Sequence, residues 1–216
     1  ITDALGAQFG VMGAQSGAFK DNMMDASIDV ISLGKGTTDV VTLVDTLSKD
    51  FGIATDRASK LPDQILDSAV AMGVSTEEAG KLFGTLMAVG NLTFDQAENL
   101  AESTYQLAQQ NKVNPSAVMS DIAGSAELIA KYGADNLESI SKAAVKARQL
   151  GLNLSTVEKI SDNLLDFQTS LTNEIEASIM IGKDLNFQKA RELALSGDIN
   201  GMMQSITEQL GGQTEF

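Results

Sequence analysis

Two missing residue types limit the chemistry that this chain can perform. Its 216 residues include no Cys and no His, which excludes thiolate nucleophiles, disulfides, typical zinc sites and imidazole bases. Paired carboxylates remain, and they can hydrolyse glycosides. The closest carboxylate groupings in the sequence are Glu77–Glu78, Glu174/Glu176 and Asp162/Asp166. A solvated helix surface explains all of them, so we predict no enzyme and no catalytic, cofactor-binding or metal-binding residue.

Two short stretches are superficially similar to ligand-binding loops. Residues 34–38 (GKGTT) echo a phosphate loop but lack its leading Gly and its Gly-Lys-Ser/Thr order. Residues 198–201 (DING) suggest a calcium loop, but Gln209 stands where an EF-hand needs a terminal Glu. We therefore interpret the first as a polar turn before a helix and predict no calcium site at the second.

The net charge narrows the possible partners. The formal charge is −14, which disfavours nucleic acid and anionic membranes because both attract basic surfaces. No run of 18 or more apolar residues is present, so we expect no stable membrane span.

The strongest pattern in the sequence is the regular recurrence of residues that end one helix and begin the next. Only two Pro and no Trp occur, and apolar residues recur at helical spacing. From residue 52 onward, a break followed by an apolar residue and a polar cap recurs, and the apolar residue stands at positions 74, 92, 113, 134 and 152. The pattern predicts an all-α fold of about nine or ten helices, an array of short capped helices packed as αα-hairpins.

The capping residues themselves can be named. An acid or amide three residues after a cap completes a capping box, and Pro is favoured at the first helical position. Pro62 is expected to begin a helix in this way. The predicted N-caps are Ser75, Thr93, Asn114, Asp135 and Ser155.

Residues 155–181 depart from this regular spacing of helix breaks and caps. No Gly or Pro occurs between them, and apolar residues continue at spacings of three or four. We predict one long helix near 155–181 that packs on its own neighbours; the alternative is a coiled-coil seam for a partner.

The first 50 residues differ in composition from the rest. Gly6, Gly10, Gly13 and Gly17 recur every three or four positions, and large apolar residues are sparse at the start. Such a row can pack against other helices in a membrane or, as we favour, in protein. We predict a Gly-rich helical segment over 1–50 that partners stabilise, and a compact helical domain over 51–216.

Several motifs resemble the tail tape-measure proteins of tailed bacteriophages. These are residues 73–79 (GVSTEEA), residues 150–154 (LGLNL) with the LLDF at 164–167, and above all residues 182–198 (GKDLNFQKARELALSGD). The resemblance covers roughly residues 70–210, and its motifs are helix punctuation rather than active-site signatures.

The resemblance implies a structural virion component and a fragment of a longer chain. Such a segment would dock at the tail tip or baseplate hub and inside the tail tube, bind tail-tip and tube proteins and copies of itself, help to set tail length, and take part in DNA ejection. Two alternatives stay open: a virion-associated, carboxylate-dependent wall hydrolase, and a helical-repeat adaptor protein of a cellular assembly.

Overall fold

The chain is helical throughout the part that the structure describes. A computed structural model describes residues 14–210, and within them it contains thirteen α-helices and no strand, which confirms the predicted all-α class. The helix count exceeds the nine or ten predicted, because breaks at residues 124–125 and 166 divide two predicted helices and a short helix precedes Pro62. Of the Gly row near the start, Gly6, Gly10 and Gly13 lie outside the described residues.

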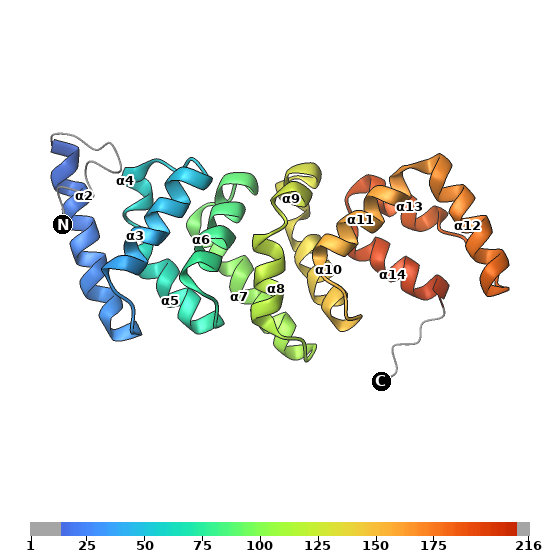
Figure 1. The fold of residues 1–216 in the computed structure, drawn as a ribbon, viewed down its shortest axis with the longest axis horizontal. Coiled ribbons are helices and arrows are strands. Elements are labelled where there is room, and N and C mark those ends of the chain that lie inside the picture. The colour runs from blue at the N-terminus through green and yellow to red at the C-terminus, as the bar shows by residue number, and fades with distance from the viewer. Residues whose placement is uncertain (1–13, 211–216) are drawn as a thin grey trace. The chain divides into compact units, whose positions relative to one another are not determined.

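The chain divides into two compact units, residues 1–102 and residues 103–216, which can be followed in Figure 1 by the residue numbers on its colour bar. Helix α7, Phe94–Gln110, begins in the first and ends in the second. Neither the predicted boundary at residue 50 nor the dependence of residues 1–50 on partners is tested by this division, so both stay predictions.

The first unit is built from short helices that pack as hairpins. Helix α3 packs against α6, and α5 packs against α2 and α6. Leu43, Leu66 and Phe83 are among its fully buried side chains, and the Phe83 ring stacks on Phe94 at 5.4 Å between centroids. The helices are α2 Ala14–Asp29, α3 Thr37–Asp45, α4 Thr55–Ala58, α5 Pro62–Met72 and α6 Thr76–Gly84, with a 3-10 turn at Val30–Leu33 and π-helical turns at Thr46–Asp50 and Thr85–Val89.

The second unit repeats this construction and then departs from it. Helix α10 packs against α8, α11 and α14, and α13 packs against α11 and α14. Its core includes Met119, Leu128, Ile140 and Leu154. The helices are α8 Pro115–Ala123, α9 Ala126–Tyr132, α10 Leu137–Gln149, α11 Leu154–Leu165, α12 Phe167–Ile181, α13 Gln188–Ser196 and α14 Ile199–Leu210, with a 3-10 turn at Ala134–Asn136.

A turn of one design recurs at the equally spaced positions 34, 73, 112 and 151, which define a 39-residue period. All four positions have positive φ, between 57° and 74°. The next residue donates its backbone N–H to the carbonyl five residues earlier, at 2.8–3.1 Å, which closes the preceding helix by a Schellman motif. The residue after that is the N-cap of the following helix: Gly36, Ser75, Asn114 and Asn153.

Buried side chains follow the same 39-residue period. The position six residues after each of the four turns is fully buried, and so is the position four residues before each turn. The two sets are Val40, Ala79, Val118 and Val157, and Val30, Ala69, Ala108 and Ala147. The chain is therefore a helical-repeat protein from residue 30 to about residue 165, with one hairpin per repeat.

Three of the five predicted caps are confirmed. Ser75 and Glu78 form a capping box in which Ser75 Oγ accepts from Glu78 N at 3.2 Å and Glu78 Oε2 accepts from Ser75 N at 3.0 Å. Thr93 and Gln96 form the amide version. Asn114 caps α8 ahead of Pro115, and Pro62 begins α5 as predicted.

The caps predicted at Asp135 and Ser155 are wrong. Asp135 lies within the 3-10 turn, and α10 begins after Asn136, which makes no side-chain cap bond. Ser155 lies inside α11, because Asn153 accepts from Thr156 N at 2.9 Å and begins the helix two residues earlier. Asn is at least as good an N-cap as Ser, so the first suitable residue after that turn prevails.

The single long helix predicted near 155–181 is also wrong, because it breaks at Asp166. There the backbone leaves the helical region (φ −78°, ψ 81°), and Asp166 Oδ1 accepts from Thr169 N at 3.4 Å. The short Asp side chain competes for backbone donors and starts a new helix. The expected packing on neighbours holds only before the break, where Val157 and Leu164 are buried; beyond it Leu171, Ile175 and Ile179 are exposed.

The corrected caps lead to a stability prediction. We expect Ser75→Ala and Asn153→Ala each to lower the free energy of unfolding by about 1 kcal/mol, because each removes the acceptor of an orphan helix N–H. Ser155→Ala is the matched control and should change it by less than about 0.5 kcal/mol, since Ser155 is an exposed residue within the first turn. Urea denaturation followed by circular dichroism measures all three. An equal cost at Ser155 and at Asn153 would contradict the assigned start of α11.

Candidate interaction surface

Four of the six carboxylates picked out in the sequence are engaged in helix stabilisation. Glu77 pairs with Lys81 one turn later at 2.7 Å, and Glu78 completes the cap at Ser75. Asp162 forms an ion pair with Lys131 from α9, whereas Asp166 caps α12. The structure therefore gives each of these four carboxylates a structural partner.

Glu158, on α11, has a perturbed carboxyl group that sequence reasoning did not identify. Burial raises its pKa, and the nearby charges of Glu127 and Asp162 raise it further. A raised pKa is useful to a general acid, but Lys131 and Lys159 act in the opposite direction. The partners come from α9 as well as α11, so no local spacing could have revealed this cluster.

The turn at residues 34–38 uses its polar groups internally. Lys35 Nζ donates to Thr76 Oγ1 at 3.1 Å, and Thr76 Oγ1 donates to Asp39 Oδ1 at 2.6 Å. The hydrogen bond from Thr76 is the main cause that lowers the pKa of Asp39, and Gly36 N donates to the same carboxylate at 3.1 Å. A carboxylate thus occupies the start of α3, where a phosphate loop would place its ligand.

The stretch at residues 198–201 serves as a helix start. Asp198 Oδ1 accepts from Gly201 N at 2.9 Å and from Ser139 Oγ at 3.0 Å, which joins α14 to α10. Among residues 14–210, no group of three or more acidic side chains is placed to hold a metal ion.

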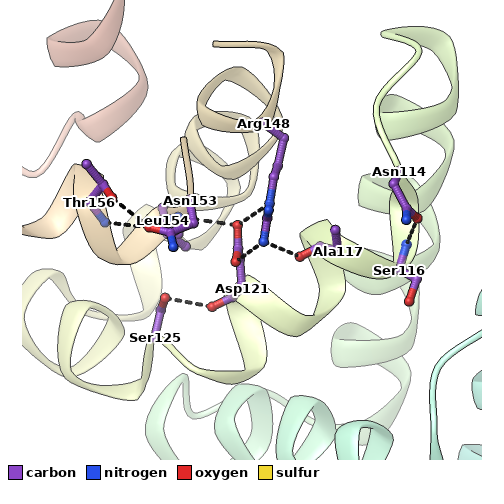
Figure 2. Close-up of polar contacts among 9 residues, drawn as sticks. All are labelled: Asn114, Ser116, Ala117, Asp121, Ser125, Arg148, Asn153, Leu154 and Thr156. Atoms are coloured by element: carbon purple, nitrogen blue, oxygen red, sulfur yellow. Dashed lines mark hydrogen bonds and ion pairs between the residues drawn. The ribbon is translucent and has the colours of Figure 1, made fainter. Parts of the chain in front are cut away.

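A polar clamp replaces part of the apolar core in the third repeat. Asp121 occupies the position that Leu43 and Leu82 hold in the earlier repeats. Figure 2 shows Arg148 from α10 reaching the Asp121 carboxylate with two nitrogens, at 2.8 and 2.6 Å. The backbone N–H of Leu154 donates to the same carboxylate at 3.3 Å. The clamp therefore fixes α8 and α10 to the first residue of α11.

A second ion pair fixes α12 to α13. Arg191 is only 5% exposed, and its Nη1 lies 2.8 Å from Glu174 Oε2 and donates to Ser170 Oγ at 3.0 Å. Glu174 also accepts from the backbone N–H of Phe187 at 2.9 Å. A buried pair of this kind is sensitive to the loss of either partner.

A groove of about 390 Å³ runs beside this ion pair, between α12 and α13. Apolar side chains from both helices form part of its walls, and the Glu174–Arg191 pair forms another part. Its lining residues are Phe167, Leu171, Glu174, Asn186, Gln188, Arg191, Glu192 and Leu195. The groove can accommodate apolar side chains without exposing them to an unbalanced charge from Glu174.

An apolar stripe extends from the groove along α12. Phe167, Leu171, Ile175 and Ile179 stand four residues apart, and their exposed fractions rise from 49% and 48% to 62% and 76%. Of the residues on α12, only Ser170 is buried. Contiguous exposed apolar surface of this kind marks interaction sites in soluble proteins. We call this row the α12 stripe, and with the groove it is the best candidate functional surface in the second unit.

Comparisons with known proteins give no relative from which the role of this surface could be inferred. Within residues 14–210, no helix combines the length and the apolar character needed to cross a membrane. No known protein family, curated protein or solved structure matches the chain significantly.

Proposed function

We propose that this chain is a structural, non-enzymatic segment of a bacteriophage tail tape-measure protein. It would reside in the virion, bind tail-tip or hub proteins and tail tube proteins, and contribute to tail length and DNA ejection. The proposal starts from the resemblance of residues 73–79, 150–154 and 182–198 to that family.

One observation carries the proposal. The segment with the strongest resemblance, residues 182–198, forms α13 and the two turns that flank it, and it supplies one wall of the groove beside the α12 stripe. A docking segment needs an exposed apolar surface on a rigid element. The resemblance and the exposed surface therefore coincide in the same part of the chain.

The engagement of the acidic residues supports a structural role. Glu77 pairs with Lys81 in its own helix, and Asp162 pairs with Lys131 of α9. Glu78 and Asp166 take part in helix caps, and Glu174 is neutralised by Arg191 in the groove. A glycosidase needs two carboxylates that face a common cleft, one of them free to donate a proton. The alternative of a wall hydrolase gains no support from these residues.

The 39-residue repeat favours a second candidate, a helical-repeat adaptor of a cellular assembly. Stacked helical hairpins are common binding scaffolds, and their surfaces recognise other proteins without catalysis. The two candidates predict different locations for the protein. An adaptor would be absent from purified virions, whereas a tape-measure segment would be present in them.

Deletions in the parent gene test the proposal. Removing part of the extended helical sequence outside this segment should shorten the tail in proportion to the residues removed, since a helix rises by a constant length per residue, about 1.5 Å. Removing residues 70–210 should block tail assembly, because this segment is the proposed docking end. Electron microscopy of negatively stained lysates measures both results.

The control is a substitution that preserves every cap. Asp162→Asn should leave tail length and infectivity nearly unchanged, because exposed ion pairs contribute little. Tails of normal length after the long deletion, or a parent gene that lies outside a tail gene cluster, would contradict the tape-measure proposal and favour the adaptor.

A further inference from the structure

Helix α12 is the element that departs from the repeat. By the 39-residue period, a turn with positive φ is due at residue 190, but the chain places it at Gly182 and Gly197 instead. The position against α10 is taken by α14, and α12 packs mainly on α11. The chain therefore does not form a regular hairpin after α11, and the apolar stripe of α12 stays exposed.

The exposure of the α12 stripe is a fixed feature of the fold. Arg191 holds α12 through Glu174 and Ser170, and Ser178 Oγ holds its last turn by accepting from Leu185 N at 3.0 Å. The polar side chains Ser170, Glu174 and Ser178 hold one side of α12 against the neighbouring chain segments. They thereby fix the rotation of the helix and keep the α12 stripe facing outward.

The stripe is most exposed at the C-terminal end of α12. Ile179 and Met180 are 76% and 86% exposed, and they lie remote from the groove-lining residues Phe167 and Leu171. One end of the helix therefore offers protruding apolar side chains, and the other offers a groove that can receive them.

The charges of α12 are arranged to suit an antiparallel copy of itself. Exposed Asp166 stands at its first turn, and Lys183 follows its last, where Lys183 Nζ donates to the carbonyl of Gln209 at 2.6 Å. Glu174 is neutralised by Arg191, so Glu176 is the remaining charge between these two ends. A second α12 in the opposite direction brings Lys183 toward Asp166 at both ends and aligns the helix dipoles favourably.

The available area suits a reversible pair of copies. At about 200 Å² for each large side chain, the exposed fractions of the α12 stripe and Leu195 leave roughly 600 Å² of apolar surface per copy. Two copies then bury roughly 1,200 Å², which is the lower end of the range for a specific interface. A symmetric pair also places Ile175 and Ile179 of one copy against Phe167, Leu171 and the groove of the other.

We propose that the chain self-associates through α12, as a two-fold symmetric dimer in which the two α12 helices run antiparallel. The interface is isologous: the α12 stripe of each copy covers the α12 stripe and groove of the other. This inference goes beyond the proposed function and holds whether the chain belongs to a phage tail or to a cellular assembly.

Sedimentation of the 216-residue chain over a range of concentrations tests the proposal. We expect a monomer–dimer equilibrium in the micromolar range, and Ile175→Asp should raise the dissociation constant by about 30-fold or more, as expected for a charge at the centre of an interface. Ile28→Asp on α2 is the matched control, because Ile28 and Ile175 are both 62% exposed. Circular dichroism establishes that both variants fold.

Orientation is tested by cross-linking, which is simple because the chain has no native Cys. When Leu171→Cys and Ile175→Cys chains are mixed and oxidised, an antiparallel pair gives mainly the mixed disulfide. Mainly same-position disulfides would indicate a parallel pair and overturn the proposal. It is likewise overturned by a monomer at several hundred micromolar, by a dimer that Ile28→Asp disrupts and Ile175→Asp does not, or by binding of the stripe to lipid vesicles in place of a second copy.

Discussion

Arg191→Met should lower the free energy of unfolding of the second unit by about 3–5 kcal/mol, the cost of breaking a buried ion pair from one side. Arg191 is 5% exposed, and the Glu174 side chain retains only 13% of its accessible surface. Removing the guanidinium leaves the Glu174 carboxylate buried beside the groove without a counter-charge, and it also deprives Ser170 of a donor. Hydrogen exchange should report the largest loss of protection in α12 and α13.

Lys81→Met is the control for Arg191→Met. The Lys81–Glu77 pair is as short, 2.7 Å against 2.8 Å, but its two side chains are 48% and 65% exposed. An exposed pair one helical turn apart contributes about 0.3–0.5 kcal/mol. Equal costs for the two variants would show that Arg191 does not stabilise the fold through burial.

A second variant separates the loss of the pair from the loss of packing. Glu174→Gln added to Arg191→Met removes the unpaired charge while its amide oxygen still accepts from Phe187 N. We expect the double variant to recover more than half of the lost stability, because replacing both partners of a buried pair is often close to neutral. A double variant as unstable as Arg191→Met alone would attribute the cost to lost packing around the Arg191 side chain.

Local signals in the sequence were enough to predict most helices of the first three repeats. Ser75, Thr93 and Asn114 are caps because each follows a chain reversal and is followed by a partner within three residues. Such bonds depend only on neighbours in the chain, so a single sequence contains the whole signal. The failures at Asp135 and Ser155 occurred where another candidate cap stands close by, because local spacing alone does not choose between them.

The sequence contains the 39-residue repeat, but it shows directly only the two shorter spacings that make up the repeat. The apolar positions 74, 92, 113, 134 and 152 are separated by shorter and longer intervals, and one interval of each kind makes the 39-residue hairpin. Glycine occupies the positive-φ position in three of the four turns, but Lys112 occupies it in the third. The residue type therefore does not identify the third turn. An L residue in this conformation is uncommon, so the residue type alone does not predict it.

The candidate surface depended on long-range contacts and could not be predicted. Glu174 and Arg191 lie in different helices, and nothing in their local spacing indicates that they meet in a buried pair. The apolar spacing of residues 167–179 predicted a packed face, but periodicity shows only that a face is apolar and not what covers it. The break at Asp166 turns that face away from the core of the unit.

Gly84→Ala should destabilise the first unit by about 1–3 kcal/mol through overpacking, although alanine is the better helix former. Gly84 ends α6, and a Cβ atom there would lie 2.3, 2.5 and 2.6 Å from three ring atoms of Phe51, far inside contact distance. Gly80, one turn earlier, similarly brings α6 close to Leu43 and Thr46. The two glycines therefore allow α6 to pack tightly on α3 and the turn that follows it.

Gly17→Ala is the matched control for Gly84→Ala. Gly17 lies inside α2, and a Cβ atom there would have no neighbour within 4 Å, so the same substitution should stabilise the chain by up to about 1 kcal/mol. Thermal unfolding of the two variants should thus shift in opposite directions from the parent chain. Phe51→Leu added to Gly84→Ala should recover part of the loss, because the smaller side chain leaves room for the new methyl group. A shift of Gly84→Ala in the same direction as Gly17→Ala would mean that the Phe51 ring moves aside at no cost, and that helix propensity rather than close packing selects the residue at position 84.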